Sequence, residues 1–135
     1  MNIKQVIVIR KDLSMRRGKE IAQGSHGSLA FIKNKLLNEC SNQEVNYGLR
    51  CDNVVFDAVE YDWLVNGQKK ICVAVQSEKD LIDIFEKASD AKLPVHLITD
   101  LGLTEFDGVP TKTCLCIGPA ESAEIDKITG GLRLY

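Results

Sequence analysis

An apolar run near the start of the chain, Val6 to Ile9, is followed by a long stretch with helical spacing, and this succession constrains the fold most. From Gly18 to about Asn38 the apolar residues recur every three or four positions, which predicts a helix with one apolar face. Small residues on this stretch, such as Gly24 and Gly27, allow a helix to lie close against a sheet. The beginning of the chain is therefore predicted to form a strand, a loop and a helix packed on the sheet.

The rest of the chain continues the alternation of strands and helices. Ser77 begins one helical segment as an N-cap, and Asn66-Gly67 and Gly130-Gly131 mark helix ends. Strands are expected at Lys70 to Val75, Val95 to Thr99 and Thr113 to Ile117, and further helices at about Val54 to Leu64 and Ser122 to Thr129. This order predicts an α/β fold: a three-layer α/β/α domain with a four-stranded mixed, mostly parallel sheet and helices on both faces.

Length and composition predict a single domain over residues 1–135, with an irregular insertion around 39–57. The chain has 135 residues, of which 44% are hydrophobic and 27% charged, which suits one core. No apolar stretch is long enough to cross a membrane, and the first residues begin a strand instead of a signal peptide, so a cytoplasmic protein is expected. Five cysteines without CxxC spacing are interpreted as free thiols, and with only two histidines no metal site is predicted.

Positive charge is concentrated near the first strand. The segment from residue 10 to residue 19 has a local charge of +4, so the remainder carries −6 to give the net charge of −2. Such a patch at one end of an acidic body can steer a polyanion to one site, although a solvated loop with ordinary surface charges is the alternative. The cations are Arg10, Lys11, Arg16, Arg17 and Lys19.

Three polar residues share one stripe of the first helix. Lys19, Gln23 and His26 stand at positions i, i+4 and i+7, close to a helix start that favours an anion or a developing negative charge. Asp100 ends a later strand. Because ligands of α/β sheets bind outside the carboxyl ends of strands, Lys19 and Asp100 are predicted to approach each other.

The sequence resembles the second type of peptidyl-tRNA hydrolase, a family found mainly in archaea and eukaryotes. The resemblance covers almost the whole chain, and the order and spacing of its motifs make it specific. It departs from the family at Ser14, where a lysine is common, at Leu101, where alanine is common, and in the longer segment 39–57. The matching motifs are Lys4 to Arg10, Asp12-Leu13 with Met15, Gly18-Lys19 with Ala22-Gln23 and His26, Trp63 with Gly67 to Lys70, Leu93-Pro94, Asp100 to Thr104, Ile117 to Ala120, and Ile125 to Gly130.

The resemblance implies a cofactor-free hydrolase that cleaves the ester between a peptide and its tRNA. Lys19, as a fixed cation, is expected to stabilise the oxyanion or hold a phosphate, and Asp100 to hold Lys19 or orient the attacking water. Thr104 and Thr113 are expected to supply hydroxyl groups. The family positions expected to form or border the active site are Lys19, Gln23, His26, Asp100, Thr104 and Thr113.

Each of these residues also has a structural interpretation. Lys19 can be a solvated lysine of the first helical turn, although a cation there is electrostatically disfavoured without a partner. Asp100 can be a turn residue and Thr113 a strand former. A buried, hydrogen-bonded core histidine is at least as good an interpretation of His26 as a general base, and Gln23 can merely satisfy backbone groups.

The tRNA is expected to be held through its backbone, without sequence preference. Arg10, Lys11, Arg16 and Arg17 are the predicted phosphate contacts, and no membrane interaction is expected. The alternative from another functional class is a non-catalytic adaptor that binds RNA or protein. The sequence leaves open the identity of the general base and whether the chain forms a homodimer.

Overall fold

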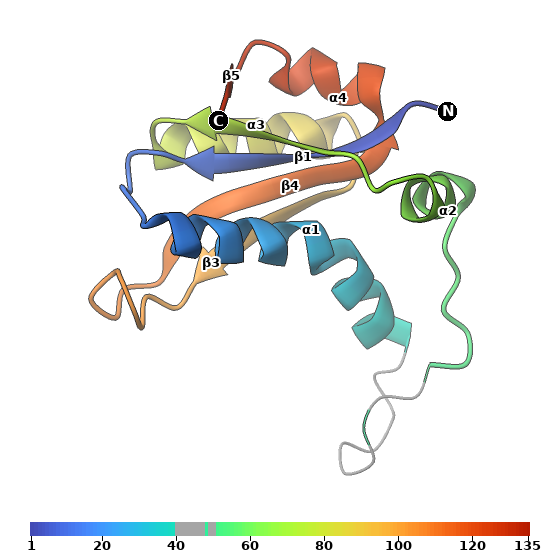
Figure 1. Ribbon diagram of the computed structural model, residues 1–135, viewed down its shortest axis with the longest axis horizontal. Helices are drawn as coiled ribbons and strands as arrows, with labels where there is room; N and C mark the ends of the chain where they lie inside the picture. Colours follow the sequence, from blue (N-terminus) through green and yellow to red (C-terminus); the bar gives the residue numbers. More distant parts are fainter. Residues whose placement is uncertain (40–47, 49–50) are drawn as a thin grey trace.

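The computed structural model describes residues 1–39, 48 and 51–135, which alternate between strands and helices (Figure 1). Most elements lie where the sequence predicts them, and Lys70–Val75 and Ser122–Thr129 agree to the residue. In chain order the elements are β1 (Ile3–Arg10), α1 (Arg17–Glu39), α2 (Ala58–Val65), β2 (Lys70–Val75), α3 (Glu78–Asp90), β3 (Val95–Asp100), β4 (Thr111–Glu121), α4 (Ser122–Thr129) and β5 (Arg133–Leu134).

The sheet is mixed, and the described part of the chain gives it five strands in the order β3-β4-β1-β2-β5, so the prediction of four strands is corrected. The additional strand, β5, has two residues and is too short for a periodic pattern to reveal. Strands β1, β2 and β3 run in one direction. Only the β1–β2 pairing is parallel, however, because β4 is inserted between β1 and β3 and runs against both. The expected mostly parallel pairing is therefore wrong.

This topology brings three chain segments to one edge of the sheet. Because β1 and β3 run in the same direction, their carboxyl ends lie together. Strand β4 runs oppositely, so its beginning lies between those two ends: Cys114 is opposite Ile9 of β1 and Ile98 of β3. Thr113, Asp100 and the loop that leads into α1 are thereby placed at the same edge.

Helices cover both faces of the sheet, as predicted. In Figure 1, α1 lies in front of the sheet and α3 behind it. On the α3 side, Leu81 and Ile84 of α3 and Ile125 of α4 pack against strand residues such as Val8 and Leu115. The opposite side chains of β1 and β4, which include Ile7 and Cys116, face α1. The central strands are therefore buried on both faces.

Two glycines of α1 permit the close packing that the small residues predict. A Cβ atom built on Gly24 would lie 3.7 Å from a methyl group of Ile7. One built on Gly27 would lie 3.3 Å from the Cβ atom of Cys116 in β4, which is tighter than an ordinary van der Waals contact. The backbone of α1 therefore rests almost directly on the sheet, which determines how far its polar side chains reach.

Helix α2 begins at Ala58, four residues later than the predicted start near Val54. Asp57 caps the helix: its carboxylate accepts a hydrogen bond from the Glu60 amide at 2.8 Å, and the Glu60 carboxylate accepts one from the Asp57 amide at 2.9 Å. Residues 51–57 form neither helix nor strand. The remainder of the predicted irregular insertion, residues 40–47 and 49–50, lies outside the described residues.

Candidate active site

Lys19 and Asp100 meet at the carboxyl edge of the sheet. The Nζ atom of Lys19, in the first turn of α1, lies 2.8 Å from Oδ1 of Asp100, the last residue of β3. The two side chains retain exposed fractions of 15% and 14%, so the ion pair is largely shielded from water and still reachable. The approach of these residues, 81 positions apart in the sequence, is confirmed.

The carboxylate of Asp100 accepts three hydrogen bonds. Oδ1 accepts from Lys19 and, at 3.1 Å, from the side-chain amide of Gln23. Oδ2 accepts from the backbone N–H of Gly102 at 2.8 Å, which is the turn contact that the structural interpretation of Asp100 anticipates. The hydrogen bond from Lys19, helped by those from Gly102 and Gln23, lowers the pKa of Asp100 against the opposing effect of burial. Asp100 is thus a fixed anion and a weak base.

The loop after β3 depends on glycine at position 102. Gly102 has φ +80°, and a Cβ atom there would lie 2.3 Å from the carbonyl oxygen of Val109. The carbonyl of Gly102 also accepts a hydrogen bond from the Gly108 amide at 2.8 Å, which closes the loop. No larger residue fits without moving the backbone. This loop conformation directs the Gly102 N–H at Asp100.

Gln23 connects the ion pair to the core. Its side chain is buried, donates to Asp100 from Nε2 and accepts from the Thr113 hydroxyl at Oε1, with 2.5 Å between the oxygens. Since Oε1 accepts the hydrogen bond from Thr113, the NH₂ group is the end of the amide that faces Asp100. Gln23 therefore bridges two side chains, whereas the structural interpretation assigned it to backbone groups.

Thr113 lies behind Gln23 and is fully buried. Its hydroxyl is engaged by Gln23, so in this structure it does not face the cleft. Thr104, by contrast, is exposed, and its Oγ1 accepts from Lys19 at 3.1 Å. An ammonium group has three donors, and two of those of Lys19 are directed at Asp100 and Thr104. The third is available to a bound oxygen.

A cavity of about 340 Å³ opens beside this cluster. His26 is exposed there and forms no hydrogen bond with the described residues, so the interpretation of His26 as a buried core histidine is wrong. The sequence did not indicate Phe106, whose ring centroid lies 5.8 Å from the Lys19 Nζ atom, because only the loop's conformation brings it there. Lining residues include Lys19, Gln23, His26, Asp100, Leu103 and Thr104.

The four predicted phosphate contacts differ in their availability. The Arg10 guanidinium is largely buried, paired with Asp12 at 2.6 Å and donating to the Lys112 carbonyl oxygen at 3.0 Å. Arg16 pairs with Glu105 of the loop after β3 at 2.7 Å, and its side chain is 81% exposed. Lys11 and Arg17 are also exposed, and the Nζ atom of Lys11 lies 4.7 Å from the ring centroid of Tyr135. These three exposed cations surround the start of α1.

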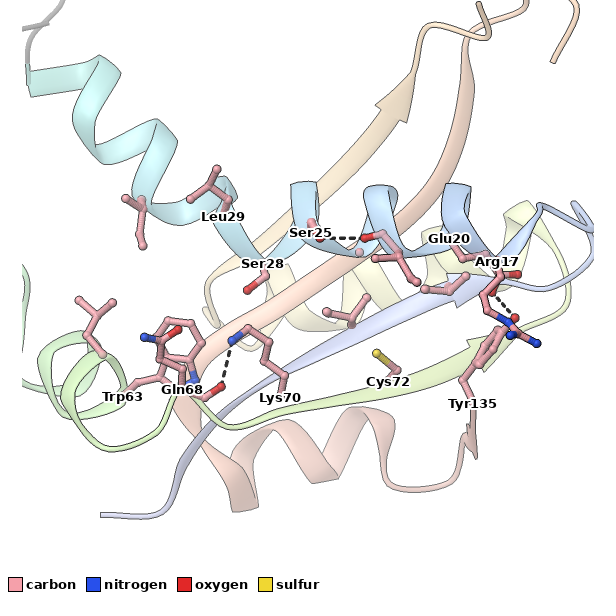
Figure 2. A pocket seen from close by; sticks show the side chains of 16 residues that line it. Arg17, Glu20, Ser25, Ser28, Leu29, Trp63, Gln68, Lys70, Cys72 and Tyr135 are labelled. Atoms are coloured by element: carbon pink, nitrogen blue, oxygen red, sulfur yellow. Dashed lines mark hydrogen bonds between the residues drawn. The ribbon is translucent and has the colours of Figure 1, made fainter. Parts of the chain in front are cut away.

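A larger cavity, of about 820 Å³, lies on the other flank of α1 and has a mainly apolar lining (Figure 2). Figure 2 shows Lys70 and Cys72 of β2 on one side and Ser25 and Leu29 of α1 on the other. Tyr135 lies at one end and donates a hydrogen bond to Glu20. The ion pair of Lys19 and Asp100 is absent from its lining and borders the smaller cavity instead.

The cysteines offer little nucleophilic chemistry. Cys114 and Cys116 are buried free thiols, and burial raises the pKa of Cys114 to about 12 and that of Cys116 further. Cys72 is free but exposed, and burial of its sulfur also raises its pKa. Cys51 is disulfide-bonded, so the interpretation of every cysteine as a free thiol is wrong.

Two further properties concern the described part of the chain only. No helix there is both long and apolar enough to pass through a bilayer. Within the same residues, no three histidine, cysteine, aspartate or glutamate side chains are grouped as metal ligands would be.

Comparison with known proteins identifies relatives along the full length of the chain. The family described as Peptidyl-tRNA hydrolase PTH2 matches residues 3–135. A protein named peptidyl-tRNA hydrolase from Methanocaldococcus jannaschii is 41% identical over 133 residues, with 98% of this chain and 99% of the relative covered. Proteins of the same name from Methanopyrus kandleri and Sulfurisphaera tokodaii are 39% and 38% identical, with coverage of 97% of both chains and 99% of both chains respectively.

A solved structure supports the fold alone. A protein of unknown function from Agrobacterium tumefaciens superimposes with a TM-score of 0.57 and covers 100% of this chain and 98% of its own. The two sequences are 11% identical, so the likeness is one of architecture.

Proposed function

The chain belongs to the Peptidyl-tRNA hydrolase PTH2 family, and we propose that it hydrolyses the ester bond between peptide and tRNA in peptidyl-tRNA, releasing free tRNA. The observation that carries the mechanism is the shielded Lys19–Asp100 ion pair on the wall of the 340 Å³ cavity. Ester hydrolysis needs a positioned water, a group that takes its proton and a donor for the charge on the carbonyl oxygen. Side chains around the cavity can supply each of these.

Lys19 is proposed to stabilise the oxyanion. As water adds to the carbonyl carbon, negative charge develops on the carbonyl oxygen, and the unused donor of the Lys19 ammonium can bind it. The positive end of α1, where Lys19 lies, favours the same charge. The tetrahedral intermediate then collapses by breaking the bond to the ribose oxygen, which takes up a proton.

His26 is the proposed proton acceptor. Asp100 is poorly suited, since the hydrogen bonds that lower its pKa also make it a weak base. His26 lines the same cavity, is exposed, and has no hydrogen bond to a described residue that would occupy its ring nitrogens. Imidazole is the side chain most often used as a general base near neutral pH. The protonated ring can return its proton to the leaving ribose oxygen.

Asp100, Gln23 and Thr113 are proposed as positioning residues. Asp100 holds Lys19, Gln23 holds Asp100, and the buried Thr113 hydroxyl fixes the orientation of the Gln23 amide. This chain of hydrogen bonds runs from the core to the reactive ammonium. Because every polar group in it has a partner, the ammonium is held in one place before substrate binds.

The exposed cations Lys11, Arg16 and Arg17 are proposed to bind tRNA phosphates beside the catalytic cavity. Arg10 is less suited, because Asp12 and the Lys112 carbonyl already engage its guanidinium. Contacts of this kind are independent of sequence, which suits a substrate class that includes many tRNAs. A location in the cytoplasm, where such substrates arise, is part of the proposal.

The non-catalytic adaptor is not favoured. Binding of RNA or protein alone gives no reason to bury a glutamine and a threonine in support of one carboxylate, or to hold a lysine against it. Polar networks of this kind are costly when any member lacks a partner. Their presence beside an open cavity is better explained by catalysis.

The test is release of the blocked amino acid from an N-acetylated aminoacyl-tRNA. Wild-type protein should release it. Lys19→Ala, which removes the oxyanion donor, and Asp100→Ala, which no longer holds the Lys19 ammonium in place, should each reduce kcat by roughly a hundredfold. Lys79→Ala is the matched control, because it removes a lysine from an exposed ion pair with Asp83 on α3. Inactive wild-type protein that is folded and binds tRNA would refute the enzymatic proposal.

A further inference from the structure

Strand β3 forms one edge of the sheet. Among the described residues it pairs with β4 on one side only, and most of its residues are half-buried, whereas β1 and β4 are almost wholly buried. An edge strand presents unpaired backbone donors and acceptors to its surroundings. The strand ends at Asp100, so this edge leads directly into the catalytic cavity.

The hydrogen-bond register identifies which backbone groups point outward. Gly118 donates to the carbonyl of Pro94 at 2.8 Å, and these two residues lie directly opposite each other when the register of Val95 with Ile117 is extended by one position. In an antiparallel pair, hydrogen-bonded and non-hydrogen-bonded positions alternate. The N–H and C=O groups of Val95 and Leu97 therefore face away from β4. Neither residue has a backbone hydrogen bond outward to any described residue.

A groove of about 650 Å³ follows this edge. It is lined by Lys33 and Asn34 of α1, by β3 from Val95 to Thr99, and by Phe85 of α3, so it takes in residues from both sides of the sheet. Its lining shares His26, Ile98 and Thr99 with the catalytic cavity. Groove and cavity are consequently neighbouring parts of one depression that runs along β3 and ends at Asp100.

We propose that the peptide portion of the substrate binds in this groove as an added strand along the free edge of β3. This inference rests on the proposed function, which places the ester at Lys19 and Asp100. The peptide's carboxyl end is the ester, so an extended peptide runs back from Asp100 toward Val95 and is parallel to β3. The six residues of β3 span about 20 Å at 3.3 Å per residue, enough for roughly five peptide residues.

Strand addition binds a peptide through its backbone and so does not depend on its sequence. The outward groups of Val95 and Leu97 bind backbone atoms, which every peptide has in the same arrangement. Side chains of the bound peptide alternate between the two sides of the edge and need no dedicated pocket. Affinity should therefore depend on the length and hydrogen-bonding capacity of the peptide and little on its composition.

The first experiment measures kcat/KM for wild-type protein on tRNAs that carry N-acetylated peptides of one, two, three, five and eight residues. Each backbone hydrogen bond gained should raise kcat/KM by roughly threefold to tenfold, until the peptide passes Val95 and the increase stops at about five residues. Equal values for all lengths would overturn the inference while leaving the proposed function intact. Absence of hydrolysis for every length would overturn both.

The second experiment moves one N-methyl group along the five-residue peptide. Only every second residue of a strand directs its N–H at a given neighbour. Methylation of an amide that faces β3 should therefore lower kcat/KM by threefold to tenfold, and methylation of an amide that faces away from β3 should have little effect. The eight-residue peptide methylated near its N-terminus is the control, since that amide lies beyond β3. A uniform response, or none, would overturn strand addition.

A third experiment removes one outward donor from the protein. Leu97→Pro deletes an N–H that β4 does not use, and proline is tolerated at such edge positions. In Leu97→Pro the ratio of kcat/KM on the five-residue substrate to kcat/KM on the one-residue substrate should fall threefold to tenfold below the wild-type ratio. An unchanged ratio in a variant whose far-UV circular dichroism matches wild type would overturn the inference. Sedimentation tests whether a second copy of the chain occupies this edge instead. If the wild-type protein is a dimer, and Leu97→Pro dissociates it without changing how kcat/KM depends on peptide length, the inference is wrong.

Discussion

The hydrogen bond between Thr113 and Gln23 can be isolated by a double-mutant cycle, because both side chains are almost completely buried. Gln23→Leu keeps the side-chain size but leaves the Thr113 hydroxyl without a partner. It also removes one of the two donors to Asp100 Oδ1. An unpaired buried donor costs about 1–3 kcal/mol, so we expect Gln23→Leu to lower the free energy of unfolding by about 3 kcal/mol.

Thr113→Val should cost about 2 kcal/mol, since it leaves Gln23 Oε1 unpaired in the core. In the double variant both partners are apolar and similar in shape to the originals, and the combined loss should be only about 2 kcal/mol. The coupling energy between the two positions is then about 3 kcal/mol, near the upper end for residues in direct contact. For a chain of this length, each kcal/mol corresponds to a shift of roughly 4 °C in Tm.

The assay is urea unfolding at neutral pH followed by far-UV circular dichroism, with equal m values confirming that the variants unfold alike. The rate of peptide release tests the role of Gln23 in positioning Asp100 separately from its contribution to stability. Gln23→Leu and the double variant both lack the hydrogen bond to Asp100, so both should lose about tenfold in kcat, although the double variant is the more stable. Additive stability losses would refute the idea that Gln23 and Thr113 act as one unit.

Three further predictions concern charge and backbone. The pKa of Asp100 is lowered on folding, so its contribution to stability should be present above about pH 4 and lost as the pH falls through the lowered value. The unfolding curves of wild type and Asp100→Asn should therefore converge in acid. Gly102→Ala should lower the free energy of unfolding by more than about 2 kcal/mol in the same denaturation assay, since its Cβ would collide with Val109. Gly108→Ala is the control: its φ is +76° but the space around it is open, so it should lower the free energy of unfolding by about 1 kcal/mol. Arg17→Ala should reduce the slope of log tRNA affinity against log salt by about one, and an unchanged slope would remove Arg17 from the phosphate contacts.

Much of the architecture was predictable because it depends on local patterns. The alternation of apolar runs with helical spacing locates β1, α1, β2 and α3, and the N-cap at Ser77 is recognisable by residue type, its hydroxyl accepting from the Asp80 amide at 3.0 Å. The order of the strands in the sheet does not follow from local patterns. The insertion of β4 between β1 and β3 is decided by tertiary packing, so the prediction of mostly parallel pairing was wrong.

The candidate active site was likewise predictable in part. Residue types, spacing and the resemblance to a known family selected Lys19, Gln23 and Asp100, and the preference of ligands for carboxyl ends of strands predicted that Lys19 and Asp100 meet. Side-chain environment was not predictable: His26 proved exposed and Thr113 fully buried. The contacts of Phe106 with Lys19 and of Glu105 with Arg16 depend on how the loop after β3 folds back.

By itself the sequence determined the succession of elements, the small-residue face of α1 and the chemical groups available at its start. These follow from propensity and periodicity, which act over a few residues. Only the tertiary structure decided which groups share a hydrogen bond, which are buried and which strand edge stays open. Such properties depend on contacts between residues far apart in the chain: Gln23 reaches Thr113 and Asp100 because α1 rests on the sheet at Gly27, and β3 is an edge because β4 pairs on its other side.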